Sequence, residues 1–242
     1  MGTLRARRPS RYDVAYRSNG ARRNPRQAMT IPTDWTFKTA DVAGEFDRHV
    51  REQLPWYDLT TGVVAHVARH YIPEGGRVYD IGASTGNVGN AIADTLTARK
   101  AELIPIDNSE AMSEIYCGPG SLVIADAAEF DYQPFDLAVL FLCLMFVPPS
   151  KRGEFIARLR SRIRPGGAII VFDKCEPATG YVATVLWRLA LAGKTAAGVD
   201  AREILAKELS LGGIQRPINP REIEPATEIF RFGDFAGWII EP

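Results

Sequence analysis

The sequence predicts an α/β fold in which a mostly parallel sheet is covered by helices on both faces, and three observations support this. A glycine-rich turn joins a short apolar strand to a helix within residues 77–96, and strand patterns then alternate with helical patterns as far as residue 211. Residues 135–147 form a nearly continuous apolar run, which is typical of a central parallel strand because such a strand is buried on both faces. The 242 residues, 46% of them apolar, suffice for one substantial domain and are too few for two.

The formal net charge of zero hides an uneven distribution of charge along the chain. The chain has 29 basic and 29 acidic residues, and residues 1–33 contain eight arginines but only one acid, Asp13. Residues 34–242 therefore contain 21 basic and 28 acidic residues. The arginine-rich segment has few apolar residues and several helix breakers, so we expect a disordered arm before a single main domain. Contact of this arm with RNA or DNA phosphates is an alternative, and so is a native start at Met29, which a measured intact mass would reveal.

The three cysteines, Cys117, Cys143 and Cys175, lie far apart in the sequence and form no C-x-x-C pair. This pattern predicts reduced thiols, a cytoplasmic protein and no bound metal. The longest apolar run, residues 137–149, is too short to span a membrane, so we expect no membrane partner. The first residues are rich in arginine rather than apolar, so a signal peptide is not expected either.

Two helices are predicted before the first strand. In residues 40–54 apolar side chains recur at every fourth position and Pro55 follows, which indicates an amphipathic helix that ends there. Residues 61–71 show a second helical pattern that stops before another proline. Trp56 and Tyr57 lie between the two helices, and Trp56 is expected either to cover a bound ligand or to pack in the core.

The glycine-rich turn after the first strand is expected to bind a nucleotide-type ligand. The missing Cβ atoms at Gly82 and Gly86 allow a ligand to approach closely, and the turn leads into the positive end of a helix for which Asn87 is the expected N-cap. The spacing differs from the G-x-G-x-x-G of dinucleotide sites because Ser84 stands where the second glycine would be. A carboxylate at Asp80 would also repel a pyrophosphate, so NAD is not favoured.

The second strand, residues 103–107, ends in an acid, Asp107. A carboxylate at this place suits a ribose ring, since its two oxygens can accept hydrogen bonds from both ribose hydroxyls. Cofactors that contain adenosine share this feature, so Asp107 indicates adenosine without telling what is attached to it; a simple helix-capping acid is the alternative. Asn108 and Ser109 then offer an N-cap for a helix that begins at Glu110.

The rest of the chain continues the alternation and ends in a hairpin. A third strand leads to Asp126, which is a turn residue if the sequence alone is considered. The expected elements are strands 78–81, 121–125, 135–147 and 168–172, helices 87–100, 151–163, 182–191 and 201–211, and antiparallel strands 228–232 and 235–240 around Gly233-Asp234. This order predicts a doubly wound sheet with an antiparallel end.

The pattern D-x-G-x-S-x-G from Asp80 to Gly86 resembles the first motif of the class I S-adenosylmethionine (SAM) methyltransferases. The resemblance implies a Rossmann-like fold with a central, mostly parallel seven-stranded sheet, a C-terminal antiparallel hairpin and an N-terminal helical cap, here residues 34–74, over the ligand pocket. It implies SAM as the cofactor. It also implies that Asp80 orients the turn and helps to hold the ammonium group of SAM.

Within this superfamily the chain is most similar to the carboxy-SAM synthases that act in tRNA wobble-uridine modification. The similarity runs from about Val42 to the C-terminus and includes the stretches VAGEFDRHVREQLPWY, VYDIGASTGN, PIDNSEAM, FLCLMFVPPSKR, RPGGAIIVFDK and EILAKELSL. It implies a homodimer and a set of SAM contacts. These are Tyr57 on the cofactor, Gly82, Ala83, Ser84 and the glycine turn through Gly86 around the methionine part, Asp107 and Asn108 on ribose, and Asp126 and Ala127 on adenine.

Three positions depart from the synthase pattern. Phe141 replaces an asparagine after the fourth strand, and we keep it as a candidate cofactor contact. Glu208 replaces the arginine that pairs with the extra carboxylate of carboxy-SAM, and an acid there would repel this group. Glu52 replaces an N-terminal arginine, for which the adjacent Arg51 could substitute. The resemblance therefore implies a retained SAM pocket without the carboxylate-handling chemistry.

The sequence thus predicts a SAM-dependent methyltransferase whose acceptor, a small molecule or a nucleic acid such as tRNA, is unassigned. A carboxy-SAM synthase-like enzyme and a SAM-binding protein without turnover are the alternatives. No side chain is identified as catalytic. Cys143 is interpreted as a small core residue, and His49 or His66 could act as a base, although surface histidines are the simpler interpretation.

Overall fold

The computed structural model describes residues 31, 36 and 40–242. The side chains of residues 40–46 are not among those described. The prediction of a disordered arm at residues 1–33 therefore falls almost wholly outside the described residues, and it stays a prediction. No helix among the described residues is both long and apolar enough to cross a membrane.

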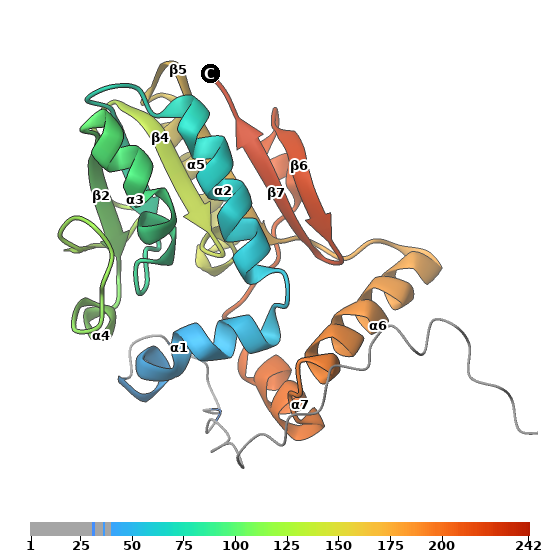
Figure 1. Cartoon of the computed structure of the whole chain (residues 1–242). Coiled ribbons are helices and arrows are strands. Elements are labelled where there is room, and N and C mark those ends of the chain that lie inside the picture. Colours follow the sequence, from blue (N-terminus) through green and yellow to red (C-terminus); the bar gives the residue numbers. More distant parts are fainter. Residues whose placement is uncertain (1–30, 32–35, 37–39) are drawn as a thin grey trace, which may run out of the picture. The chain divides into compact units, whose positions relative to one another are not determined.

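A single seven-stranded sheet in the order β3-β2-β1-β4-β5-β7-β6 forms the centre of the described chain (Figure 1). Neighbouring strands are parallel from β3 to β5, whereas β7 runs antiparallel to both β5 and β6. The strands are β1 (Arg77–Ile81), β2 (Glu102–Asp107), β3 (Val123–Ile124), β4 (Phe135–Phe141), β5 (Ile163–Lys174), β6 (Thr227–Phe232) and β7 (Phe235–Ile240). The predicted fold class, with its C-terminal antiparallel hairpin, is confirmed.

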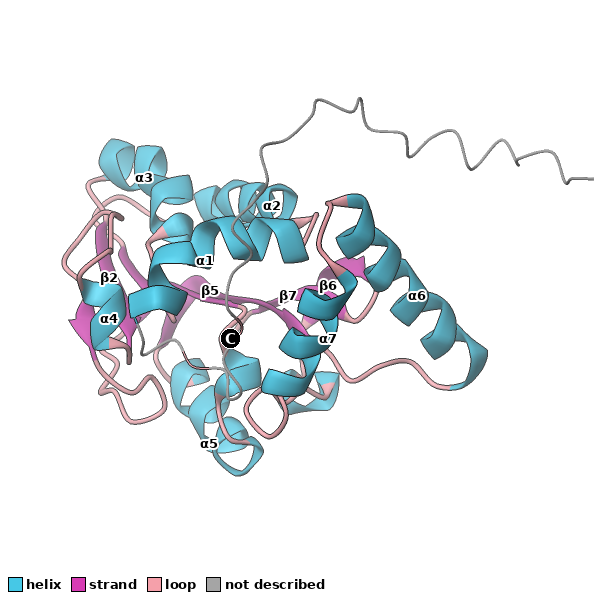
Figure 2. Cartoon of the chain, turned by 90° about the horizontal axis from the view of Figure 1, so that it is seen from below, coloured by secondary structure: helices cyan, strands magenta, loops and turns pink. Residues whose placement is uncertain are grey.

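Helices cover both faces of the sheet, as the view in Figure 2 shows with α2 and α3 on one side and α5 on the other. The helices are α1 (Ala40–Gln53), α2 (Tyr57–Tyr71), α3 (Asn87–Arg99), α4 (Glu110–Ser113), α5 (Pro149–Arg160), α6 (Gly180–Ala196) and α7 (Ala201–Ser210), with short 3-10 turns η1 (Leu144–Phe146) and η2 (Pro220–Ile223). α6 and α7 lie beyond the carboxyl end of β5, next to α1 (Figure 1).

Strand β4 is apolar at every position except Asp136, and all seven of its residues are buried. Ala138 and Leu140 pack in the apolar cluster that contains Phe155 of α5. Leu137 and Val139 pack in the cluster on the opposite face, with α2 and α3. A strand enclosed by helices on both faces has no solvent side, so the usual alternation of polar and apolar residues is lost.

Several boundaries differ from the sequence expectations. β4 ends at Phe141 instead of residue 147, and α6 spans Gly180–Ala196 instead of residues 182–191. α2 begins at Tyr57 rather than at residue 61. The third strand is only two residues long, because β3 pairs with β2 at two positions and lies at the edge of the sheet. α5 ends at Arg160, and Ile163, expected as its last residue, instead begins β5 by pairing with Phe135.

Candidate functional site

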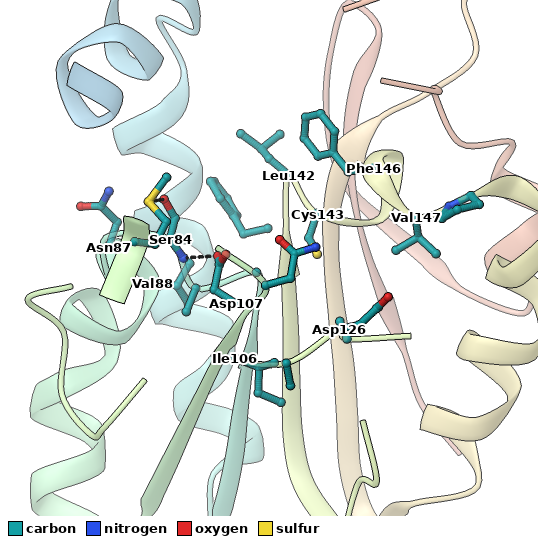
Figure 3. A pocket seen from close by; sticks show the side chains of 18 of the residues that line it. Ser84, Asn87, Val88, Ile106, Asp107, Asp126, Leu142, Cys143, Phe146 and Val147 are labelled. Carbon is teal, nitrogen blue, oxygen red and sulfur yellow. Dashed lines mark hydrogen bonds between the residues drawn. The ribbon is translucent and has the colours of Figure 1, made fainter. Parts of the chain in front are cut away.

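The carboxyl ends of β1, β2 and β4 open onto a cavity of about 260 Å³ (Figure 3). Because these strands are parallel neighbours, the turns that follow them meet at one edge of the sheet. Nine of the eleven residues expected to contact the cofactor line this first cavity: Tyr57, Gly82, Ala83, Ser84, Asp107, Asn108, Asp126, Ala127 and Phe141.

The turn after β1 has a backbone that requires glycine at one position. Gly82 has φ of 76°, and a Cβ placed there would lie 2.7 Å from Cys143 Sγ. Ser84 also has a positive φ, of 50°, so it adopts the left-handed conformation that a glycine would favour. The amides of Gly82 and Ala83 donate to the carbonyl of Ile106 at 2.8 and 2.9 Å, which fixes the turn against β2. The backbone is thus shaped for close approach of a ligand.

Asp107 joins two turns through its carboxylate. Its Oδ2 accepts a hydrogen bond from the Ser84 amide at 2.9 Å, drawn in Figure 3, and its Oδ1 accepts one from the Ser109 amide at 2.9 Å. Burial raises the pKa of Asp107, although these backbone amides oppose the shift. Each oxygen can accept a further hydrogen bond, so both remain suited to ribose hydroxyls. The N-cap of α4 is Ser109 as expected, but its side chain makes no capping bond.

Asp80 and Gly86 do not line the first cavity. Asp80 is only 1% exposed, and its burial raises its pKa to about 7 in spite of a hydrogen bond from the Gly89 amide. Through this hydrogen bond it supports the first turn of α3. Gly86, with φ of 93°, is the N-cap of α3, so the expectation of Asn87 in that role is wrong. Asp80 Oδ2 accepts no hydrogen bond from the described residues, and the cofactor contacts of Asp80 and Gly86 stay predictions.

A polar network that the sequence did not reveal ties α1 to the glycine turn. Asp47 Oδ1 accepts hydrogen bonds from Thr85 Oγ1 at 2.7 Å and from Asn87 Nδ2 at 2.6 Å. The same amide lies 3.3 Å from the hydroxyl of Tyr57. In the sequence Asp47 is only one of the polar residues of an amphipathic helix. Its neighbours in the sequence do not distinguish it from a solvent-exposed acid.

Glu52, which replaces the N-terminal arginine of the synthases, and the adjacent Arg51 have different surroundings. The Arg51 guanidinium lies 5.2 Å from the centre of the Tyr57 ring, and its Nε donates to Asp58 at 2.9 Å. Glu52 lies 3.9 Å from Arg48 in an ion pair on the same helix. Arg51 thus lies against a residue of the first cavity, as a substitute for the missing arginine would.

The remaining expected contacts, Asp126, Ala127 and Phe141, also line the first cavity. Asp126 Oδ1 accepts from the Ala128 amide at 2.8 Å, so it does stabilise a turn while lining the cavity. Phe141 meets the Tyr57 ring edge-on, with 5.4 Å between centroids. Sequence reasoning missed the wall residues Asn87, Val88, Ile106, Met112, Ala125, Leu142, Cys143, Phe146, Val147 and Pro148. Cys143 belongs to this wall rather than only to the core.

A second cavity of about 160 Å³ adjoins the first, and Leu142 and Phe146 line both. Its wall combines α1, α6, α7 and the β6–β7 turn. The residues are His49, Val50, Gln53, Leu54, Pro55, Trp56, Leu142, Met145, Phe146, Lys174, Trp187, Ala190, Leu191, Lys194, Lys207, Glu208, Leu211, Gln215, Phe232, Asp234 and Phe235. Trp56 is buried here against Phe235, with 4.7 Å between ring centroids, and it does not line the first cavity.

His49 is 5% exposed, so its interpretation as a surface histidine is wrong. Its Nδ1 lies 3.6 Å from Glu203 Oε1 of α7. Burial, together with Lys207 and Lys194, lowers the pKa of His49 to about 4, so the imidazole is neutral at neutral pH. By contrast, His66 contacts His70 on α2 and lines neither cavity.

Glu208 accepts a hydrogen bond from Lys194 Nζ at 2.9 Å and lines the second cavity. Burial opposes ionisation of this acid, but Lys194 and Lys174 outweigh it and lower the pKa of Glu208. Burial and Lys194 lower the pKa of Lys207 to about 5. Glu208, at the position of the synthase arginine, is thus paired with Lys194 in this chain.

Residues 78–167 match a family described as the methyltransferase domain. Two bacterial relatives are carboxy-S-adenosyl-L-methionine synthases. That of Staphylococcus epidermidis is 26% identical over 213 residues, which cover 86% of this chain and 93% of the relative. That of Shewanella denitrificans is 28% identical over 221 residues, which cover 88% of this chain and 90% of the relative.

Solved structures of methyltransferases share the fold at low sequence identity. Human N-acetylserotonin methyltransferase in complex with SAM superposes with a TM-score of 0.54 at 12% identity, covering 84% of this chain and 56% of that one. A putative O-methyltransferase from Nostoc punctiforme gives a TM-score of 0.53 at 15% identity, covering 83% of this chain and 58% of that one. At such identities the similarity concerns the fold alone.

Proposed function

We propose a function on the premise that this chain is a SAM-dependent enzyme with a methyltransferase domain of class I fold. We infer that it transfers the methyl group of SAM, which it binds in the first cavity, to an acceptor that enters from the second. The observation that carries the proposal is Asp107, a carboxylate at the tip of β2 that faces the cavity and already holds the glycine turn through Ser84.

Residues of suitable chemistry line the first cavity for each part of SAM. The backbone of Gly82, Ala83 and Ser84 would enclose the methionine part, and Arg51, which lies near Tyr57, would pair with the carboxylate of that methionine part. Bound SAM supplies an activated methyl group. The protein then has to hold the acceptor in line with that group and to exclude water, and apolar wall residues such as Leu142 and Phe146 suit this task.

The ribose and adenine of the cofactor would lie toward the other end. Asp107 and Asn108 would bind the ribose hydroxyls, while Asp126 and Ala127 would bind the adenine edge. Phe141 would pack against the cofactor where the synthases have an asparagine. Asp80 would act from beneath the turn instead of touching the ammonium group directly.

A carboxy-SAM synthase-like activity is the second candidate, and the two synthase relatives favour it. Against it stands Glu208. Its carboxylate is bound to Lys194 at 2.9 Å, so the second cavity presents an acid where an anionic group would need a cation. We therefore expect unmodified SAM as the ligand.

Mass spectrometry of the small molecule released from protein purified without added ligand tests the proposal, with calorimetric titration of SAM, S-adenosylhomocysteine and carboxy-SAM. We expect SAM or S-adenosylhomocysteine to be recovered. Carboxy-SAM should bind at least tenfold more weakly than SAM, because its extra carboxylate would be unpaired and an unpaired charge costs about 1.4 kcal/mol or more. Glu208→Arg should reverse this preference. Recovery of carboxy-SAM from the native protein would establish the second candidate, and absence of SAM binding would refute both.

We also propose a cytoplasmic homodimer. The three cysteines are free, which suits a reducing compartment. Large apolar side chains of α6 and α7 are exposed: Tyr181 at 75%, Val182 at 56%, Trp187 at 56%, Leu205 at 60% and Leu209 at 71%. A surface of this kind commonly marks a protein interface.

Sedimentation velocity should therefore show a dimer at micromolar concentration. The double variant Tyr181→Glu/Leu209→Glu should be a monomer, because the charges would have to be desolvated in the interface. Lys100→Glu, on the exposed end of α3, is the matched control and should remain dimeric. A monomeric native protein would contradict the proposal.

A further inference from the structure

The second cavity has the size of a single aromatic ring. Its volume of about 160 Å³ is close to that of the engineered cavity of about 150 Å³ that binds benzene. Trp56, Phe146, Trp187 and Phe235 supply aromatic faces around it. It shares Leu142 and Phe146 with the first cavity, so a ring held there would be next to the cofactor.

This wall holds two acids, Glu208 and Asp234, and three lysines. Glu208 is bound to Lys194, and Lys174 donates a hydrogen bond to the neutral Gln215 at 3.1 Å. The lowered pKa of Lys207 leaves its amine largely neutral at neutral pH. The wall therefore has no excess of positive charge for a carboxylate, and an uncharged ring fits it better.

Two buried oxygens of the wall indicate that the occupant carries hydrogen-bond donors. Gln53 Oε1 and Asp234 Oδ1 accept no hydrogen bond from the described part of the chain. Gln53 is 7% exposed, and its amide donates to Glu203 at 3.3 Å, which orients the oxygen. Buried acceptors are nearly always satisfied in native proteins, so ligand hydroxyls are the natural partners.

His49 stands one helical turn before Gln53 on the same face of α1 and lines the same cavity. Glu203 reaches both side chains from α7. The carboxylate of Glu203 lies close enough to Nδ1 to orient a neutral imidazole, and a neutral imidazole can act as a general base. The groups that face His49 are Glu203, Lys207, Lys194 and Arg48.

We propose that the second cavity binds the methyl acceptor, that this acceptor is a single-ring phenol with a second hydroxyl, and that His49 accepts the proton of the hydroxyl that reacts. In the step, the phenol oxygen forms a bond to the methyl carbon of SAM. The carbon–sulfur bond breaks with its electron pair going to sulfur, which leaves S-adenosylhomocysteine, and the hydroxyl proton passes to His49 Nε2. Glu203 is a positioning residue for His49. This inference rests on the proposed methyltransferase function.

Calorimetric titration of catechol into the protein saturated with S-adenosylhomocysteine tests the binding site. Ala190→Trp fills the cavity and should weaken catechol binding more than tenfold, while SAM affinity changes less than twofold, because Ala190 does not line the first cavity. Ala192→Trp, exposed two residues further on α6 and outside both cavities, is the matched control and should change neither affinity. Benzoate should bind more weakly than catechol.

The role of His49 has its own measurement. His49→Gln should retain catechol affinity within about threefold and lower kcat for catechol methylation by about 10²–10⁴, the usual contribution of a general base. Glu203→Gln should lower kcat less. A normal kcat in His49→Gln would refute the base. Unchanged catechol binding in Ala190→Trp, or binding of benzoate in preference to catechol, would overturn the site and its ligand class. Normal SAM binding without catechol binding would refute this inference alone, whereas lack of SAM binding would refute the proposed function.

Discussion

Asp107→Ala is expected to weaken SAM binding about 100-fold or more. The variant removes two acceptors for the ribose hydroxyls, and each hydrogen bond to a charged group contributes about 1.5–3 kcal/mol. It also releases the amides of Ser84 and Ser109, so the glycine turn loses its tie to the end of β2. Isothermal titration calorimetry with SAM measures the loss, and Asp107→Asn should lie between the native protein and the alanine variant.

Glu110→Ala is the matched control, because Glu110 is an exposed acid on the first turn of α4, three residues from Asp107. It should bind SAM like the native protein. Circular dichroism of Asp107→Ala should show that the fold is kept. Unaltered SAM affinity in a folded Asp107→Ala would contradict the placement of ribose and with it the proposed orientation of the cofactor.

The second large effect concerns stability, and we expect Arg152→Ala to lower the free energy of unfolding by about 3–5 kcal/mol. Arg152 is 1% exposed, although it is an arginine. Its guanidinium donates to the carbonyls of Met145, Val147, Arg216 and Pro217 and pairs with Glu222 at 3.0 Å. Without it, Val147 and Pro217 would lose the guanidinium donor to their carbonyls and Glu222 would lose its ion pair.

Urea denaturation measures the loss in Arg152→Ala, and Arg152→Lys should recover only part of it because an ammonium group cannot reach so many carbonyls at once. Lys151→Ala, the adjacent residue with an exposed ion pair to Glu129, should leave the denaturation midpoint nearly unchanged. Since Arg152 holds the segment that includes Phe146 and Val147, the alanine variant should also bind SAM more weakly. A native-like midpoint in Arg152→Ala would show that the pairing contributes little.

The motif from Asp80 to Gly86 predicted a SAM-dependent class I enzyme, and the match of residues 78–167 to a methyltransferase domain together with the strand order confirms this. The reason lies in local chemistry. Only glycine fits the left-handed turn at Gly82 against Cys143, and an acid at the tip of β2 suits the two hydroxyls of a ribose. Such constraints act over a few residues, so they can be recognised without knowing what lies across the fold.

Helix starts were less certain, because neighbouring side chains can replace the expected caps. Asn87 looked like an N-cap, yet its amide binds Asp47 of α1 instead, and Gly86 supplies the backbone conformation. Ser109 is the N-cap of α4, as predicted, but its hydroxyl makes no capping hydrogen bond. Its backbone amide instead donates to the carboxylate of Asp107. In both cases a residue from another element competes with the local pattern.

The sequence by itself determined the order of strands and helices, the glycine turn and the acids at the strand tips, since periodicity and turn chemistry encode these locally. Only the tertiary structure decided that Asp80 and Arg152 are both buried. It alone brought His49 and Glu203 together across 154 residues of chain, next to a second cavity built from α1, α6, α7 and the C-terminal hairpin. Contacts between elements so far apart depend on how whole helices pack, and no short stretch of sequence records that packing.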